Sequence, residues 1–356
     1  MTLPKIRAKI DAIDQKLLQL LNSRADLVHE IGLLKRKGGM LPYAPEREEK
    51  LLRSLARRNS GGRLSEQSVR AIYREIMSAS LALEKDLTIA YLGPAATWTH
   101  QAARGKFGAS VKYSPQSNIS EVFNAVARGR ADYGVVPIEN STEGAVSHTL
   151  DVFMDSELKI CAQILLKIEN NLIANISQGK IRKIYSHPQV FGQCRQWLRQ
   201  NFPGADLVEV SSTTRAAELA AKEKGAAALA GRMAAEVYKL RILQGSVQDN
   251  PHNTTRFLVL GKETCPRTGD DKTSIMFGVQ DKTGALFRAL EPFQRLKVNM
   301  SKIESRPSKR KAWEYFFFVD VDGHVTDKKV VRALNALKKH CTFVKILGSY
   351  PRSAGM

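Results

Sequence analysis

Apolar side chains recur every three or four positions through the first 86 residues, which is the spacing of one face of an α-helix. The longest such series contains Ile6, Ile10, Ile13, Leu17, Leu20, Leu27 and Ile31. Glycine pairs at 38–39 and 61–62 interrupt the pattern, and Ser65 can cap a new helix. The pattern predicts three helices, over Pro4 to Lys37, Pro45 to Arg58 and Ser65 to Lys85.

The pattern changes at Leu87, where short apolar runs begin to alternate with helical stretches. This alternation is typical of an α/β domain. The runs predict strands over Leu87 to Leu92, Tyr133 to Ile138, Lys183 to Tyr185, Ala226 to Ala230 and Phe257 to Leu260.

A polar segment from Thr264 to Asp271, containing Pro266 and Gly269, predicts a linker. The rest of the chain has the order βαββαβ, which is ferredoxin-like. Its predicted elements are a strand over Thr273 to Gln280, a helix from Gly284, strands over Val298 to Arg306 and Trp313 to Val321, a helix over Asp327 to Lys339 and a strand over Thr342 to Leu347. We therefore expect three domains, 1–86, 87–263 and 271–356.

Arg24 occupies a position in the apolar face of the first helix where leucine or isoleucine would be expected. Lys35 follows within roughly 20° of the same face and about 16 Å further along the axis, so the two cations could hold one small dianion. Arg7 lies about 25 Å from Arg24 along the helix. It could serve the same ligand only from a second chain, in an antiparallel pair of helices. The alternative is that Arg7 and Lys35 are solvated and that Arg24 extends its charge to water.

The formal net charge of +20 raises the question of nucleic-acid binding. The basic clusters lack the interleaved aromatic residues of a base-stacking surface, and they match no DNA-binding pattern. We favour solvated basic faces and expect no nucleic-acid partner. Such a positive field would also draw anionic substrates toward a cleft.

No stretch approaches 18 apolar residues, and the start of the chain lacks a signal-peptide core. We therefore expect a cytoplasmic protein with no membrane segment. The four cysteines are far apart and form no CxxC pair, which predicts reduced thiols. We predict neither a metal nor a cofactor.

The first domain resembles the all-helical type of chorismate mutase, on the segments IRAKIDAIDQKLLQLLNSRADLVHEIG, PEREEKLL and IYREIMSASLALEK. The resemblance implies that chorismate rearranges to prephenate in a domain-intertwined dimer. Lys35 and Glu84 would be the catalytic donors to the ether oxygen. Glu84 can donate only when protonated, so the rate should fall as this carboxyl group ionises. Ala44 replaces a polar residue of some relatives. The residues that match the chorismate-binding positions of the family are Arg7, Arg24, Lys35, Arg47, Glu48, Ser80 and Glu84.

The second domain resembles prephenate dehydratase, on the segments IAYLGPAATWTHQAA, VVPIENSTEGAVSHTLD, IYSHPQVFGQC, SSTTRAA, AALAGRMAAEVY and NTTRFLVLG. The resemblance implies two α/β lobes around a cleft, as in periplasmic binding proteins, with the last segment returning to the first lobe. Thr255 would be the catalytic residue, as an orienting donor or proton relay, because a hydroxyl group is a poor acid. Ala96 replaces a usual glycine, which would strain the turn if it needs a positive φ, and Trp98 replaces a usual Phe. The expected prephenate-binding residues are Glu139, Asn140, Ser186, Gln193, Thr255 and Arg256, the last of which could instead hold the loop.

The third domain resembles the ACT regulatory domain, on DKTGALFRAL, IESRP and the segments from WEYFFFVDVDGH to ILGSYPR. The resemblance implies that L-phenylalanine binds as an allosteric inhibitor between paired domains. A helix N-terminus would hold its carboxylate and an acidic side chain its ammonium group. The alternative is a domain that serves only dimerisation. The matching positions are Gly284, Ala285, Leu286, Glu304, Ser305, Arg306 and Pro307.

The order of these three domains is similar to that of the bifunctional chorismate mutase/prephenate dehydratase family. This similarity implies an enzyme of phenylalanine biosynthesis that makes phenylpyruvate from chorismate and is inhibited by phenylalanine. We expect a homodimer or a higher homo-oligomer. Two other classes stay open: a non-catalytic sensor of small molecules, because both later domain types also bind ligands without chemistry, and a basic regulator that binds nucleic acid.

Overall fold

A computed structural model describes residues 2–40, 42–308 and 314–353. The chain divides into two compact units, one made of residues 1–88 with 106–112 and the other of residues 89–105 with 113–356. In the described part of the chain, no helix is both long and apolar enough to cross a membrane. The cytoplasmic location expected from the sequence stays a prediction.

The first unit contains the three helices that the apolar spacing predicts, each within one residue of the expected bounds. The hydroxyl group of Ser65 accepts a hydrogen bond from the Ser68 N–H at 3.0 Å, which confirms the predicted helix cap. Proline in the first turn begins each of the other two helices. The helices are α1 (Leu3–Lys37), α2 (Pro45–Arg58) and α3 (Glu66–Glu84).

Most of α1 is exposed, including its predicted apolar face. Only Val28 and Gly32 are buried on this helix. The apolar side chains Ile10 and Leu20 are 50% and 67% exposed. An apolar face of this length is unfavourable in water.

A short stretch of later sequence, 106–112, packs with the helices of the first unit. The Phe107 ring lies 4.9 Å from the Tyr43 ring, and the Ser110 N–H donates to the Ser78 hydroxyl at 2.9 Å. Gly108 has a φ of +73°, and a Cβ there would lie 2.4 Å from the Ser78 Cβ, so the position requires glycine. This stretch falls within the range 87–263 that the sequence assigns to the second domain.

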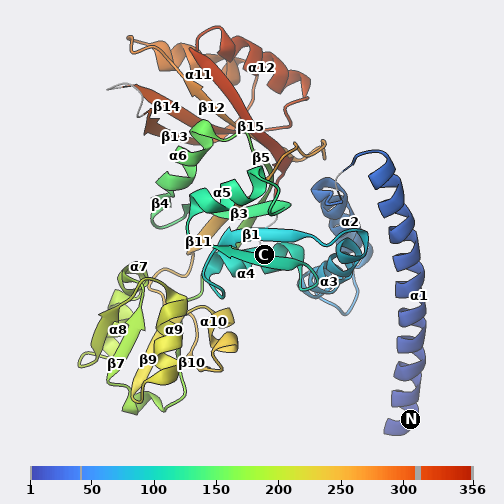
Figure 1. The fold of residues 1–356 in the computed structure, drawn as a ribbon, viewed down its shortest axis with the longest axis vertical. Coiled ribbons are helices and arrows are strands. Elements are labelled where there is room, and N and C mark those ends of the chain that lie inside the picture. Colours follow the sequence, from blue (N-terminus) through green and yellow to red (C-terminus); the bar gives the residue numbers. More distant parts are fainter. Residues whose placement is uncertain (1, 41, 309–313, 354–356) are drawn as a thin grey trace. The chain divides into compact units, whose positions relative to one another are not determined.

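The middle of the chain forms two α/β lobes, as the sequence resemblance implies (Figure 1). In the first lobe the sheet order is β2-β1-β3-β11-β5, with β4 paired to β3. Strand β11 returns from the far end of the domain to lie between β3 and β5, antiparallel to both. The first lobe consists of β1 (Thr88–Leu92), α4 (Trp98–Phe107), β2 (Lys112–Gln116), α5 (Ile119–Ala127), β3 (Tyr133–Asn140), β4 (Gly144–Ala145), α6 (Ser147–Asp155), β5 (Lys159–Lys167) and β11 (Thr254–Gly261).

The second lobe has a five-stranded sheet in the order β10-β6-β9-β7-β8. The Trp98 ring of the first lobe packs against the Gly231 backbone of the second, and Thr214 donates to the Ala95 carbonyl at 2.9 Å. The second lobe consists of β6 (Asn171–Ala174), a 3-10 turn (Gln178–Lys180), β7 (Lys183–Ser186), α7 (Pro188–Gln193), α8 (Arg195–Asn201), β8 (Asp206–Glu209), α9 (Thr213–Lys222), β9 (Ala226–Ala230), α10 (Arg232–Val237) and β10 (Arg241–Gln244).

The last part of the chain has the predicted βαββαβ order, in an antiparallel sheet with the strand order β13-β14-β12-β15. The helices α11 and α12 cover one face of this sheet (Figure 1). The other face packs against the first lobe through an apolar cluster that includes Phe318, Leu347 and Phe153. The elements are β12 (Asp271–Gly278), α11 (Ala285–Arg295), β13 (Met300–Pro307), β14 (Tyr315–Asp322), α12 (Lys328–Lys338) and β15 (Phe343–Pro351). Trp313, the predicted start of a strand, lies outside the described residues.

Ala96 adopts the left-handed backbone conformation that its replacement of a glycine led us to expect, with a φ of +64°. The residue is buried, and its N–H donates to Nδ1 of His100 at 3.0 Å. Burial, followed by the charge of Arg104, lowers the pKa of His100, which favours the neutral ring that can accept this bond. The turn is therefore formed despite the strain of an L residue at this φ.

We expect Ala96→Gly to leave the urea-unfolding midpoint unchanged or to raise it. A left-handed L residue costs roughly 1–2 kcal/mol, whereas glycine costs about 0.5–1 kcal/mol in backbone entropy. The matched control is Ala125→Gly, at a similarly buried alanine inside α5, which should lower stability by about 1 kcal/mol. Equal losses of stability in the two variants would show that Ala96 is not strained.

Candidate active sites

Four of the predicted chorismate-binding residues meet as two pairs between α1 and α3. Arg24 Nη1 donates to the Ser80 hydroxyl at 2.5 Å, and Lys35 Nζ donates to Glu84 Oε2 at 2.9 Å. The Lys35 ammonium also donates to the Pro42 carbonyl at 2.6 Å. The spacing of the two cations on one helix face thus places both beside polar side chains of the third helix.

The other three predicted residues of this site are Glu48, Arg47 and Arg7. Glu48 is buried, and its Oε2 lies 3.1 Å from Arg74 Nη1 and 3.4 Å from Lys106 Nζ. Burial lowers the pKa of Lys106, which Glu48 partly opposes. Arg47 and Arg7 are both exposed. Arg74 and Lys106 are not among the residues predicted from the sequence, and no spacing signal singles out either.

In the second unit, Thr255 of β11 lies opposite Asn140 of β3. The backbone N–H groups of Thr142 and Glu143 donate to Asn140 Oδ1 at 2.9 and 3.2 Å. Because a backbone N–H can only donate, these contacts fix the orientation of the amide group and turn Nδ2 toward Thr255. Asn140 Nδ2 then donates to Thr255 Oγ1 at 2.7 Å. The threonine oxygen accepts in this bond, so its own hydrogen can be donated to a ligand.

A chain of amide groups extends from this pair to the second lobe. Asn140 Nδ2 also donates to Asn253 Oδ1 at 2.8 Å, and Asn253 Nδ2 donates to Gln193 Oε1 at 3.0 Å. The buried Asn170 donates to the same Gln193 oxygen at 3.2 Å. A pocket of about 270 Å³ lies here, lined by Thr142, Glu143, Gly192, Gln193, Gln248, Asp249, Asn250 and Asn253. The sequence analysis did not single out Asn253, although the NTTRFLVLG segment contains it.

Ser186, at the end of β7, is fully buried, and its hydroxyl group donates to the Leu229 carbonyl of the neighbouring β9 at 2.8 Å. The structure therefore joins Asn140, Gln193 and Thr255 in one hydrogen-bonded network. The Ser186 hydroxyl group is not part of this network, because it donates to a backbone carbonyl within the second lobe.

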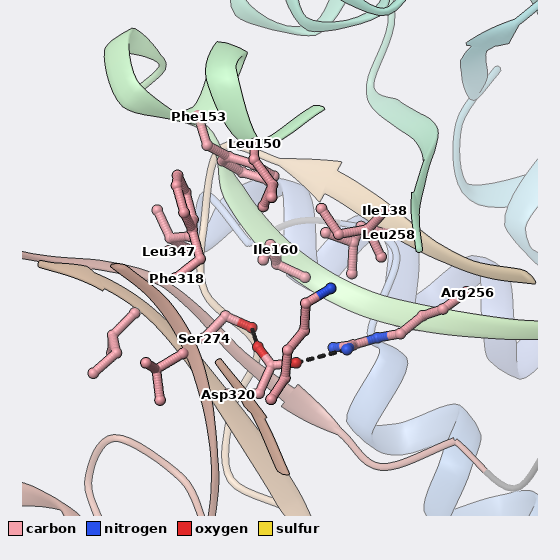
Figure 2. A pocket seen from close by; sticks show the side chains of 13 residues that line it. Ile138, Leu150, Phe153, Ile160, Arg256, Leu258, Ser274, Phe318, Asp320 and Leu347 are labelled. Atoms are coloured by element: carbon pink, nitrogen blue, oxygen red, sulfur yellow. Dashed lines mark hydrogen bonds and ion pairs between the residues drawn. The ribbon is translucent and has the colours of Figure 1, made fainter. Parts of the chain in front are cut away.

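Glu139 and Arg256 face away from this network and meet the βαββαβ domain. Arg256 Nη1 lies 2.9 Å from Glu139 Oε1 and 2.6 Å from Asp320 Oδ2, in a largely apolar setting (Figure 2). Lys302 forms an ion pair with the other Glu139 oxygen. Burial alone would raise the pKa of the Glu139 carboxyl, but Lys302 and then Arg256 outweigh it and hold this pKa below its usual range. The two side chains are thus already engaged within the protein, so this geometry does not support the expected hydrogen bonds from them to prephenate.

The predicted phenylalanine-binding residues lie in two places. Ala285 and Leu286, after the left-handed Gly284 that begins α11, line a pocket of about 680 Å³. Its other described lining residues are Val279, Gln280, Asp281, Lys282, Glu314, Tyr315, Phe317 and Thr342. The second predicted group, Glu304 to Pro307, lies on the edge strand β13. Within that group the Arg306 guanidinium pairs with Asp151 of α6 at 3.1 Å.

Three known domain families match successive parts of the chain. Residues 6–85 match chorismate mutase type II, residues 89–265 match prephenate dehydratase and residues 273–339 match the ACT domain.

Known relatives resemble the chain over its whole length. The bifunctional chorismate mutase/prephenate dehydratase of Aquifex aeolicus is 47% identical, over 99% of this chain and 98% of the relative. That of Pseudomonas aeruginosa is 41% identical over the same shares of both chains. Among solved structures, a prephenate dehydratase from Arthrobacter aurescens in complex with L-Phe is 34% identical, with a TM-score of 0.71, over 76% of this chain and 92% of that one.

Proposed function

Because the chain belongs to the bifunctional chorismate mutase/prephenate dehydratase family, we propose that it converts chorismate to prephenate and then prephenate to phenylpyruvate, under inhibition by L-phenylalanine. One observation carries the proposal. A single chain contains the Arg24–Ser80 and Lys35–Glu84 pairs between α1 and α3. It also contains the Asn140–Thr255 pair, and its domains follow the order of the family.

The helical unit would carry out the rearrangement, which needs no nucleophile. It requires a substrate held in a compact conformation and positive or donor groups where the breaking C–O bond becomes negative. Arg24 would bind a substrate carboxylate, with Ser80 beside it. Lys35 would donate a hydrogen bond to the ether oxygen. Glu84 Oε2 lies 2.9 Å from Lys35 Nζ, so a protonated Glu84 would donate to the same oxygen.

A second copy of the chain would complete this site. The exposed apolar face of α1 requires a covering surface, and an antiparallel pair of helices would cover both faces by two-fold symmetry. Arg7 lies about 25 Å from Arg24 along α1, which is too far for both residues of one chain to reach the same small ligand. In the pair, the partner copy would supply its Arg7. Arg47, exposed on α2, would bind the same substrate.

Replacing Glu84 by glutamine should flatten the pH profile of the mutase. The Glu84 side chain accepts a hydrogen bond from Lys35, and a carboxyl group can donate to the ether oxygen only in its protonated form, so the rate should fall as pH rises. A glutamine amide donates at every pH. We expect Glu84→Gln to lose this fall, measured as kcat/KM for chorismate across pH 5 to about 9. An unchanged profile would exclude Glu84 as the titrating donor.

The two-lobed domain would then remove CO2 and the ring hydroxyl group of prephenate, a step that aromatisation drives. Thr255 would donate to the departing hydroxyl group, oriented by Asn140. Asn253, Gln193 and Asn170 would hold the polar parts of the substrate across the lobes. Because a hydroxyl group is a weak acid, Thr255 would act as a donor or relay.

L-Phenylalanine would bind at the N-terminus of α11. The pocket there already contains Ala285 and Leu286, but in this chain the described residues that line it include none of Glu304 to Pro307. We infer that the β13 group of a second copy completes the pocket, as the sequence resemblance implies. The L-Phe complex of the Arthrobacter aurescens dehydratase supports a phenylalanine site in this family.

The test is to supply the purified full chain with chorismate alone and to follow chorismate, prephenate and phenylpyruvate, with and without L-phenylalanine. Phenylpyruvate formation that phenylalanine suppresses is the expected result. Accumulation of prephenate would contradict the dehydratase function. Binding of these ligands without turnover would support the sensor alternative, and salt-dependent DNA affinity without turnover would support the nucleic-acid alternative.

A further inference from the structure

The end of β3 that carries Asn140 lies beyond an irregularity in its pairing with β11. Asn140 is opposite Thr255, and the next pair is Glu139 with Arg256. The register then shifts, so that Pro137 faces the residue after Arg256. Proline has no N–H to donate to a neighbouring strand. Beyond this irregularity Ser141 holds the end of β3 to β11, because its N–H donates to the Thr254 carbonyl and its hydroxyl group accepts from the Thr254 N–H, both at 2.9 Å.

The ACT domain adds contacts at the same end of β3. Side chains alternate between the faces of a strand, so Glu139 and Arg256 point away from the face that carries Asn140 and Thr255. On the face of the first-lobe sheet that carries Glu139 and Arg256, every strand of the ACT sheet contributes one side chain to a network around Arg256. These side chains are Ser274 of β12, Lys302 of β13, Asp320 of β14 and Tyr350 of β15.

The part of the network around Arg256 is buried, whereas the Glu139 side chain is 32% exposed. Arg256 and Asp320 are each 6% exposed, and Figure 2 shows the Arg256 guanidinium aimed at Asp320, which in turn bonds Ser274. Arg256 Nη2 donates to the Tyr350 hydroxyl at 2.8 Å. A buried charge that loses its partner is strongly unfavourable, so this arrangement resists any shift of the two strands.

We propose that Lys302 and Asp320 of the ACT domain are positioning residues of the dehydratase. They hold Glu139 and Arg256, and the backbone of these two residues holds the adjacent Asn140 and Thr255 at the distance that catalysis requires. The proposal rests on the proposed function of the Asn140–Thr255 pair. It gives Glu139 and Arg256 an indirect role, in contrast to the direct contact with prephenate that the sequence suggests.

The first test is Lys302→Met in the full chain, which removes the charge and keeps the length of the side chain. With prephenate supplied directly, we expect kcat to fall about 10- to 100-fold and KM to change less than about threefold, since small misplacements of catalytic groups cost this much. Lys302→Arg should restore most of kcat. The mutase rate of the same preparation, which uses the other unit, reports on folding.

The matched control is Lys345→Met, because Lys345 also crosses from the ACT domain to the first lobe. Its ammonium donates to the Ser156 carbonyl at 2.7 Å and pairs with Glu157, both distant in sequence from the catalytic pair. We expect this variant to keep the dehydratase kcat. An equal fall of kcat in Lys345→Met would overturn the proposal, because any loosening of the domain contact would then suffice.

Asp320→Asn provides a second variant should Lys302→Met fold poorly, since it keeps the shape of the side chain and a bond to Ser274. It should lower kcat in the same way. Unchanged kcat in both variants, or a rise in KM at constant kcat, would overturn the proposal, the latter in favour of direct contact with prephenate. If the unaltered chain turns over no prephenate, the proposed function fails first, and the positioning role with it.

Discussion

Thr255→Ala should lower the dehydratase kcat by a factor of about 10² to 10⁴, the range for loss of one proton donor or relay. The variant keeps the strand but removes the oxygen that accepts from Asn140 Nδ2 at 2.7 Å and the hydrogen that would assist the departing hydroxyl group. Supplied with chorismate, the variant should accumulate prephenate, because the helical unit is unaltered. The measurement is phenylpyruvate formation from prephenate supplied directly.

The neighbouring Thr254 offers a matched control. Both threonines are partly buried on β11, but their side chains point to opposite faces of the sheet. Thr254→Ala should therefore keep kcat within about threefold of the unaltered chain, which is a change of well under 1 kcal/mol. Thr255→Ser, which retains the hydroxyl group, should recover much of the activity. A similar loss in both alanine variants would mean that the strand, rather than the Thr255 hydroxyl group, is sensitive.

The helices and the ACT strand order follow from local pattern. Proline at the helix starts, Ser65 as a cap and the paired glycines define α1 to α3 because each acts on neighbouring backbone groups. The βαββαβ order follows in the same way from alternating runs. The long apolar face of α1 is also visible in the sequence, and its exposure in the structure is the basis of the proposed pairing.

The contact of Glu139 and Arg256 with prephenate stays a prediction, and the structure shows why these two side chains differ from Asn140 and Thr255. Adjacent residues of a strand point to opposite faces, so the side chains of Glu139 and Asn140 lie on opposite faces of the sheet, as do those of Thr255 and Arg256. The predicted strands end at Ile138 and begin at Phe257, so all four residues lie outside them, and only the structure extends the strands to include these residues. The partners of Arg256 could not be predicted from the sequence either, because Asp320 lies 64 positions later and only the packing of two domains brings it near.

Glu48 illustrates the same limit in the helical unit. Its motif position predicts a ligand contact, but its carboxylate lies between Arg74 and Lys106, the latter from a stretch of sequence beyond the predicted domain boundary. Burial of a carboxylate favours such pairing over exposure to a ligand. No local pattern indicates that residues 106–112 pack with the helices.

Lys35→Met should lower kcat/KM of the mutase by a factor of about 10² to 10³, the range for loss of one donor to a developing negative charge. Methionine keeps an unbranched apolar side chain of similar length, so the packing of α1 on α3 is retained. The loss arises because the rearrangement uses no nucleophile, so the rate depends on donors that stabilise the negative charge on the ether oxygen, and the variant removes one of them. The measurement is the initial rate of chorismate loss.

The control is Lys37→Met, two residues further along the same helix, where the side chain is exposed in the last turn. It removes the same charge from the same chain, so any effect of net charge on attracting the anionic substrate would appear in both variants. We expect Lys37→Met to keep the mutase rate and both variants to keep the dehydratase rate.

The Lys35 ammonium also donates to the Pro42 carbonyl at 2.6 Å. Lys35→Arg should therefore separate this loop contact from donation to the ether oxygen. A guanidinium that restores the loop contact without placing a point charge on the ether oxygen would leave most of the loss in place.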